Sequence, residues 1–216
     1  YVDELAKLDT EISPYLQVVV SEVGVILPVT NAVQYVNGAT AYAALLCTLP
    51  KQSAPTNKKL PGVKAIRFDF SLRQLSRLTS KKFVTFRIKD GTSLVVTDGV
   101  TTAPSILLGG VNRDSDFARV STLRIAQLAI TVVREAVDPF IGEANGMPEY
   151  NALNTAIKSA LETIREAGAI TGYKFSVANV TSRMDEATVI LEIVPAFELR
   201  RVQVQVNLSP SDEYLA

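Results

Sequence analysis

The chain has 216 residues, of which 47% are hydrophobic and 20% are charged, with 22 basic and 22 acidic side chains. This length and composition allow a folded core and exclude a disordered chain, and the zero net charge gives no electrostatic reason to expect nucleic acid or an anionic membrane as a partner. The absence of histidine and the single cysteine exclude Ser-His-Asp catalysis, His-ligated metal sites and internal disulfides.

The first hundred residues alternate between short helices and short strands. Residues 1–14 are an N-terminal segment with a weak helical signal over Val2–Leu8. Because residue 1 is Tyr, we expect a fragment, a processed form or the ordered part of a longer chain. For residues 15–100 we expect a first α/β part. Its elements are a strand over Leu16–Ile26 interrupted at Gly24, a helix over Thr40–Leu49 after the Asn37-Gly38 turn signal, a surface loop over Lys51–Gly62, a strand over Lys64–Phe68, a helix over Leu72–Leu78 capped by Ser71, and a hairpin of Phe83–Lys89 with Thr92–Thr97 around Asp90-Gly91. Cys47 lies in an apolar run and is expected to be a small buried residue.

The second half of the chain carries sharper signals. Residues 101–118 are rich in Gly, Ser, Pro and Asp and predict a linker. For residues 119–216 we expect an α+β domain, with helices packed on a mixed β-sheet. Its elements are a helix over Thr122–Val137 capped by Ser121, a second helix that begins at Pro148 and ends before Gly168, and strands over Tyr173–Val180, Thr188–Val194 and Leu199–Leu208, of which the first two form a hairpin.

The last strand candidate has the most regular pattern in the chain. Within Arg201–Leu208, four apolar residues alternate with polar ones and share one face of an extended chain: Val202, Val204, Val206 and Leu208. Such a strand either completes the sheet of its own domain or adds to a neighbour's sheet by β-augmentation. The pattern alone favours the first arrangement.

Residue types and spacing predict no active site. The sequence has no phosphate-binding loop, and Asp114 and Asp116 lack the spacing of a calcium loop. Glu192 and Glu198 are expected on a solvated face. Three arginines lie on or beside the long helix in positions that favour inter-subunit ion pairs over catalysis: Arg119, Arg124 and Arg134. We therefore expect no catalytic residue, metal or cofactor, and no apolar run reaches the ~20 residues of a membrane helix.

Several blocks resemble the C-terminal part of contractile-tail sheath proteins, which are found in myophages and related injection particles. The blocks are Ser121-Thr-Leu-Arg-Ile125, Val133-Arg-Glu, Asp138-Pro-Phe-Ile-Gly142, Asn151-Ala-Leu-Asn154, Gly168-Ala-Ile170 and Val194-Pro-Ala-Phe-Glu-Leu-Arg200, with Ser53-Ala-Pro-Thr-Asn57, Leu60-Pro-Gly-Val63 and Val95-Val-Thr-Asp-Gly-Val100 upstream. The resemblance covers most of the chain. The sequence departs from the family in having no Trp before the Ala-Pro loop and no recognisable N-terminal arm.

The resemblance implies a structural protein that is no enzyme. Subunits of this family form hexameric rings stacked around an inner tail tube, and the stack contracts to drive the tube through the host envelope. The implied partners are other copies of the chain, the tube protein, and baseplate and tail-terminator proteins, without nucleic-acid contact or membrane insertion. The implied location is the virion, after assembly in the host cytoplasm.

Two sets of site residues follow from the resemblance. The strand with Val202, Val204, Val206 and Leu208 would be donated to a neighbouring subunit, and the domain face near Glu143 and Glu149 would meet the tube. The alternatives left open are another structural or baseplate component and a non-catalytic binding module. A deep pocket with convergent charged residues would instead favour an enzyme.

Overall fold

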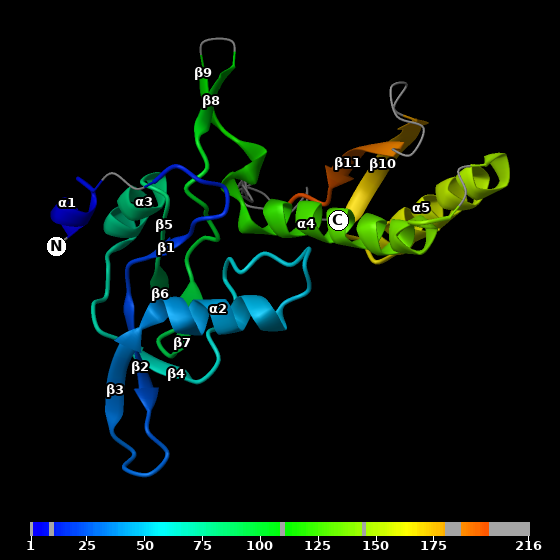
Figure 1. Cartoon of the computed structure of the whole chain (residues 1–216). Coiled ribbons are helices and arrows are strands. Elements are labelled where there is room, and N and C mark those ends of the chain that lie inside the picture. The colour runs from blue at the N-terminus through cyan, green and yellow to red at the C-terminus, as the bar shows by residue number, and fades with distance from the viewer. Residues whose placement is uncertain (1, 9–10, 109–110, 144–145, 180–186, 199–216) are drawn as a thin grey trace, which may run out of the picture.

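A computed structural model describes residues 2–8, 11–108, 111–143, 146–179 and 187–198 of the chain. Figure 1 shows an N-terminal part with several short sheets and an elongated C-terminal part in which two long helices lie beside a hairpin. Helices and strands occur in both parts, which confirms the predicted α+β class. The last strand candidate, Leu199–Leu208, lies outside the described residues.

The N-terminal part packs its main core between helix α2 and short antiparallel sheets. Strands β3, β2 and β4 form a three-stranded sheet in that order, β6 and β7 form the predicted hairpin, and β1 pairs with β5 in parallel. The elements are α1 (Val2–Leu5), β1 (Val18–Val19), β2 (Glu22–Ile26), β3 (Val33–Asn37), α2 (Gly38–Thr48), β4 (Val63–Ile66), α3 (Leu72–Ser80), β5 (Phe83–Val84), β6 (Phe86–Lys89) and β7 (Ser93–Val96).

Local chemistry explains where these elements begin and turn. The Ser71 side chain accepts a hydrogen bond from the Gln74 amide and forms a capping box with it, so the predicted cap of α3 is confirmed. Asp90 and Gly91 both have positive φ, of 52° and 73°, and they form the turn in the three-residue connection between the paired residues Lys89 and Ser93. The Asn37-Gly38 pair acts differently from the expected turn. The Asn37 side chain accepts a hydrogen bond from Ala39 N at 2.8 Å, so this pair is the start of α2.

Two sequence predictions for this part are wrong. The strand over Leu16–Ile26 is broken at Val20-Ser21 and not at Gly24, because β1 leaves the sheet to pair with β5. Gly24 instead lies inside β2, where an added Cβ would stand 2.7 Å from Val33 Cγ1. Cys47 is exposed and not buried. Only one side of α2 is covered by the core, so the apolar composition of this helix did not decide which of its residues are buried.

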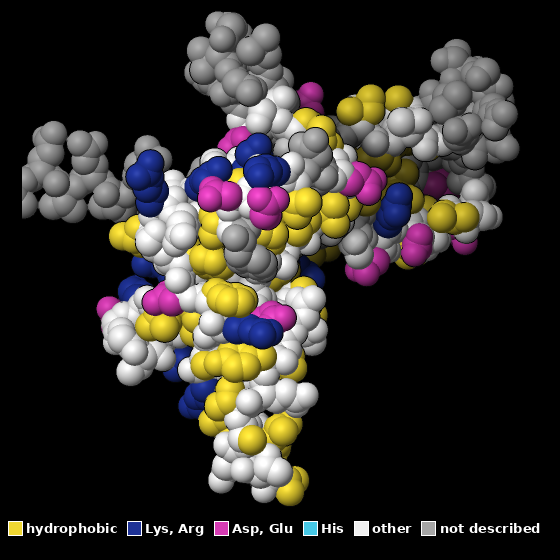
Figure 2. Space-filling view, turned by 90° about the vertical axis from the view of Figure 1, so that its left-hand side faces the viewer, with side chains coloured by type: hydrophobic (Ala, Val, Ile, Leu, Met, Phe, Trp, Pro, Cys, Tyr) yellow, Lys and Arg dark blue, Asp and Glu magenta, His cyan; other side chains and the backbone are white. Residues whose placement is uncertain are grey.

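The hairpin of β2 and β3 extends beyond the core of the N-terminal part. Its outer residues are largely exposed, with Val29 at 94%, Val33 at 48% and Tyr35 at 45% of their full accessible surface. Figure 2 shows hydrophobic side chains at this narrow end of the molecule. Such an uncovered apolar surface is typical of a contact region.

Residues 101–118 are not a linker in their local structure. Thr101, Thr102 and Ala103 are buried, and the Thr101 hydroxyl donates to the Phe117 carbonyl at 2.6 Å. Strands β8 (Ser105–Leu108) and β9 (Val111–Asp114) form an antiparallel hairpin that projects from the body (Figure 1). The short 3-10 helix η1 (Asp116–Ala118) leads into the C-terminal part. The glycine-rich composition predicted irregular structure, whereas Gly109-Gly110 lies between two strands.

The C-terminal part has a core of its own between two helices and a hairpin. The elements are α4 (Val120–Val137), the 3-10 helix η2 (Asp138–Phe140), α5 (Met147–Glu166), β10 (Ile170–Asn179) and β11 (Ala187–Pro195). Pro148 lies in the first turn of α5, and Gly168 follows its end with φ of 74°, both as predicted. Ser121 is not the cap of α4. The helix begins at Val120, two residues before the predicted start, and Ser121 is buried in its first turn.

Candidate inter-subunit sheet and charged cleft

The hairpin of β10 and β11 packs one face on the two long helices. Its nine cross-strand pairs include Phe175 with Leu191 and Val177 with Val189. These four residues belong to the same apolar cluster as the fully buried Ile157. Strand β10 contacts α5 and strand β11 contacts α4, so each strand lies over one helix.

Two tyrosines bind α5 to β10 at well-separated positions. The Tyr150 hydroxyl, in the first turn of α5, donates to the Val177 carbonyl at 2.6 Å. The Tyr173 hydroxyl donates to Glu162 Oε1 near the other end of the helix, at 2.7 Å. This second hydrogen bond raises the pKa of Tyr173 above its ordinary value, because the carboxylate accepts it from the protonated phenol and so stabilises the neutral form. The two contacts hold the strand in register along the helix.

The helix layer is wider than the two described strands that cover it. Two packed helices, each ~10 Å in diameter, span ~20 Å, whereas strands lie ~4.8 Å apart, so a helix pair has room for about four strands. The described residues supply two. Accordingly, the helix-facing side chains of Val189, Leu191 and Ile193 are only half-buried, as are Leu128 and Val132 on α4. Among the described residues neither outer edge of this sheet has a partner strand, so each edge offers hydrogen-bonding groups to a further strand.

The predicted inter-subunit strand cannot be placed on this sheet. Its apolar residues, Val202, Val204, Val206 and Leu208, lie outside the described residues, and their role stays a prediction.

The predicted tube-facing residues lie at the connection between α4 and α5. Glu143 is exposed and Glu149 is half-buried, on the two sides of this connection. Two large apolar side chains lie beside them, Ile141 at 75% and Met147 at 72% exposure. The connection therefore presents uncovered apolar surface with carboxylates close by. Its contact with a tube stays a prediction.

The three predicted arginines differ in their surroundings. Arg119 forms an ion pair with Asp98 at 2.5 Å, and its Nη1 atom lies 3.7 Å from Glu198 Oε1. Arg124 donates from Nη2 to the carbonyl oxygens of Leu46 at 2.8 Å and Leu49 at 2.7 Å, at the end of α2. Both therefore join the C-terminal part to the N-terminal part of the same chain. Arg134 lies exposed near the end of α4. Contacts of these arginines with another subunit stay a prediction.

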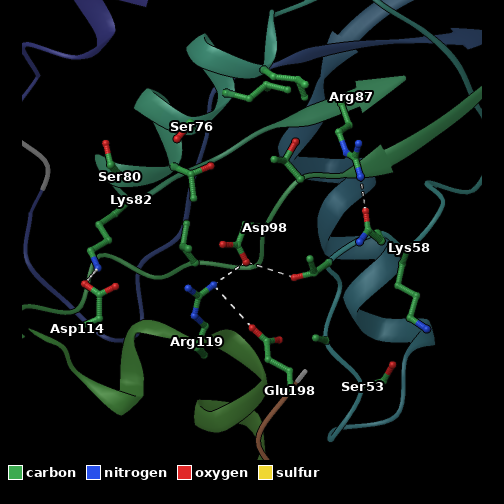
Figure 3. A pocket seen from close by; sticks show the side chains of 18 of the residues that line it. Ser53, Lys58, Ser76, Ser80, Lys82, Arg87, Asp98, Asp114, Arg119 and Glu198 are labelled. Atoms are coloured by element: carbon green, nitrogen blue, oxygen red, sulfur yellow. Dashed lines mark hydrogen bonds and ion pairs between the residues drawn. The ribbon is translucent and has the colours of Figure 1, made fainter. Parts of the chain in front are cut away.

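An open cleft of about 920 Å³ lies where the two parts meet (Figure 3). It lies between the 52–58 loop, α3 and the start of α4, and its charged lining residues are Lys58, Lys82, Arg87, Asp98, Asp114, Arg119 and Glu198. A pocket of this kind is what would favour an enzyme, so the pairing of its charges decides how it is interpreted.

Each carboxylate of the cleft has a cationic partner within the chain. Lys82 pairs with Asp114 and lowers the pKa of that carboxyl group by its hydrogen bond, and Arg119 pairs with Asp98 and Glu198. Because these carboxylates and cations neutralise one another, the cleft is better interpreted as a set of ion pairs that holds neighbouring elements together than as a site of acid–base chemistry. In the described part of the chain, no three His, Cys, Asp or Glu side chains are grouped to hold a metal ion. No helix described is long and apolar enough to cross a membrane.

Sequence reasoning missed the role of Asp98 and was wrong about Glu198. Glu198 was expected on a solvated face, yet its side chain is 12% exposed and accepts a hydrogen bond from the Ser121 hydroxyl at 3.3 Å. Asp98, Arg119 and Glu198 are far apart in the sequence and share no motif. Only the packing of the two parts brings them together.

Comparison with known proteins gives a clear result for the fold alone. No protein-family model and no curated protein sequence matches the chain. A solved chain of the anti-feeding prophage baseplate matches with a TM-score of 0.75 and 17% identity, over 92% of this chain and 56% of that one. A chain of the contracted PVC sheath complex, from an extracellular contractile injection system, matches with a TM-score of 0.75 and 14% identity, over 97% and 60%.

A bacterial sheath tail protein shows the same fold. The protein from Listeria innocua matches with a TM-score of 0.66 and 13% identity, over 83% of this chain and 42% of its own. The chain thus spans about half the length of these structures, and its fold is that of the tail sheath proteins of contractile injection systems.

Proposed function

We propose that the chain is a structural subunit of a contractile tail sheath. In this proposal, copies polymerise as stacked hexameric rings around an inner tube, and the stack shortens to drive the tube through a target envelope. The likeness to a chain of the contracted helical sheath of the anti-feeding prophage, with a TM-score of 0.71 over 91% of this chain, supports the proposal. At 19% identity this likeness concerns the fold alone. The proposed assembly and contraction are therefore argued from the open edges of the β10–β11 sheet and from the exposed surfaces of the chain.

The observation that carries the proposal is the two-stranded sheet of β10 and β11 on a helix layer with room for about four strands. In the assembly, the alternating segment Arg201–Leu208 of one subunit adds to an open edge of this sheet in the next. Burial of four apolar side chains contributes on the order of 10 kcal/mol before the cost of ordering the segment, which removes a large part of it.

Strand exchange suits a polymer that changes length. A single segment binds weakly, but several exchanges per subunit raise the effective concentration and keep neighbours attached. The subunit bodies are then free to move between two packing arrangements while backbone hydrogen bonds hold the lattice together. The zero net charge of the chain avoids repulsion between closely packed copies.

Deletion of residues 199–216 tests the exchange. The shortened chain should keep its folded helices and strands, because its three described apolar clusters are formed by residues before 199, and it should fail to form tubules. Circular dichroism reports the fold, and electron microscopy of the full-length and shortened proteins reports assembly. Deletion of residues 210–216 is the matched control, since it leaves the alternating segment intact. Tubules formed by the 199–216 deletion would refute strand donation.

The tube is proposed to contact the connection between α4 and α5. Exposed Ile141 and Met147, with Glu143 and Glu149 beside them, provide an apolar contact surrounded by charge. The partner here is the inner tube protein, with baseplate and tail-terminator proteins at the two ends of the stack. Glu143→Lys combined with Glu149→Lys should reduce tube-templated assembly. Glu166→Lys, at the far end of α5, is the control, and equal assembly by both variants would count against this contact.

A second candidate function is a structural component of the baseplate. The likeness to a chain of the anti-feeding prophage baseplate favours this alternative. Electron microscopy of the assembled full-length protein separates the two, because a sheath subunit forms long hollow tubules and a baseplate component stops at closed rings.

A further inference from the structure

The three residues that follow β11 differ in how they contact the rest of the protein. The Ala196 amide donates to the Ala169 carbonyl at 3.0 Å, which continues the contact of this end of the sheet by one residue. Phe197 is 63% exposed, whereas the next side chain, Glu198, is only 12% exposed. The Glu198 side chain is therefore inserted into the body of the protein, directly after the exposed Phe197.

Glu198 is held by two groups at the start of α4. Its Oε2 atom accepts a hydrogen bond from Ser121 Oγ at 3.3 Å. Its Oε1 atom lies 3.7 Å from Arg119 Nη1, and Figure 3 shows this second contact. The first turn of α4 contains no acidic residue, so the Glu198 carboxylate also provides negative charge next to the positive end of the helix dipole. Both contacts are largely shielded from water, because the side chains of Glu198 and Arg119 are each only 12% exposed.

The Arg119 guanidinium group thus pairs with two carboxylates that lie far apart in the sequence. Asp98 follows β7 in the N-terminal part, and Glu198 precedes the proposed exchange segment. Arg119 is only 12% exposed and Asp98 only 11%, so this ion pair lies largely buried in the body of the protein. Glu198 connects the C-terminal segment to that body.

We propose that Glu198, bound by Arg119 and Ser121, is the anchor that fixes the point and direction in which the C-terminal segment leaves the subunit. This inference rests on the proposed strand exchange for its biological use. Glu198 is a positioning residue, because it acts on Val202 and the following residues through the chain and not by contact with the neighbouring sheet.

The size of the effect follows from the reach of the chain. From Glu198 to Val202 there are four residue steps, which span at most about 14 Å. Without the anchor, the last fixed residue is Ala196, and six steps span about 20 Å. The volume within reach of Val202 then rises about threefold, and the effective concentration of the segment at the neighbouring edge falls by the same factor. Without the anchor the direction of the segment is also no longer fixed, which lowers its effective concentration further.

Spin labels on the full chain test the anchor directly. One label is placed on exposed Cys47 and the other on Gln203→Cys, and the distance distribution is measured in dilute protein below the assembly concentration. Glu198→Gln should broaden this distribution clearly, because the neutral amide keeps the shape of the side chain and loses the ion pair. Ser121→Ala should broaden it less. Glu192→Gln, an exposed position on β11, is the control and should leave it unchanged.

A comparison with Asp98→Asn separates anchoring from general stabilisation. This variant should lower the melting temperature more than Glu198→Gln and leave the width of the distance distribution unchanged. Glu198→Gln should instead raise the concentration needed for assembly about threefold or more. A distribution that keeps its width in both Glu198→Gln and Ser121→Ala would overturn the proposal. Broadening in Glu198→Gln supports it even where the 199–216 deletion still assembles, an outcome that would refute only the strand exchange.

Discussion

Replacement of Arg124 by Met should destabilise the chain strongly, although this residue was expected to act between subunits. Its Nη2 atom donates to the carbonyl oxygens of Leu46 and Leu49, at 2.8 and 2.7 Å. These carbonyls lie at the end of α2, where a helix leaves acceptors without partners of its own. A methionine fills similar space and donates no hydrogen bond, so the variant leaves both acceptors without this donor.

The magnitude follows from two charge-assisted hydrogen bonds. Each contributes ~1.5–3 kcal/mol net, which gives a ceiling of about 6 kcal/mol. Burial opposes this gain, because it lowers the pKa of Arg124 and leaves Nη1 without a hydrogen-bond partner among the described residues. We therefore expect a loss of about 2–3 kcal/mol in the free energy of unfolding.

Urea denaturation followed by circular dichroism measures this loss. With a denaturant slope of about 2 kcal/mol per molar, the midpoint should fall by roughly 1–1.5 M. Arg134→Met is the matched control, because Arg134 lies ten positions further along the same helix and is exposed. It should change stability by less than ~0.5 kcal/mol. Equal midpoints for the two variants would refute the view that Arg124 joins α4 to α2.

Three further predictions concern the N-terminal part. Burial raises the pKa of Tyr42 far above its ordinary value. The unfolded chain therefore ionises this group first, near pH 10, and the stability from the neutral phenol is complete below that pH and is lost as the pH rises further. Tyr42→Phe should lower the free energy of unfolding by about 1 kcal/mol at pH 7, because the hydrogen bond from Gln17 at 3.2 Å is lost. The melting temperatures of this variant at pH 7 and pH 11 should nevertheless differ less than those of the wild type, because the variant has no phenol to ionise at this position. Gly38→Ala should destabilise by ~1–3 kcal/mol in thermal unfolding, since an added Cβ would collide with the Ser21 carbonyl and the Phe86 ring, and a stability equal to wild type would contradict the packing at the start of α2. Cys47 should react with a thiol reagent in the native protein as fast as in urea, and strong native protection would show that α2 is covered.

Signals that span only a few residues predicted local structure well. The apolar spacing of α5, its Pro148 start and its Gly168 end are set by neighbours within one or two turns, and the structure agrees with them. The same holds for the Ser71 capping box and the Asp90-Gly91 hairpin. The resemblance of short blocks to sheath proteins likewise agrees with the observed fold.

Predictions from composition alone were wrong where the same residues are compatible with several structures. The glycine-rich 101–118 stretch suits a linker and also a hairpin with a Gly-Gly connection, and the structure has the hairpin. The apolar run around Cys47 suits a buried helix, but only contact with β1 and β2 decides which side of α2 is covered. In both cases the deciding partner is distant in the sequence.

The sequence by itself determined the class of the fold, the two long helices, the β10–β11 hairpin and the alternating segment after them. It did so because periodicity, caps and turns depend on residues that are close along the chain. Only the tertiary structure decided that Arg119 and Arg124 join the two parts of one chain, that Glu198 lies beside Ser121, and that the helix layer is wider than the two described strands on it. These features depend on the packing of distant segments, and no spacing within the sequence encodes the distance between two packed elements.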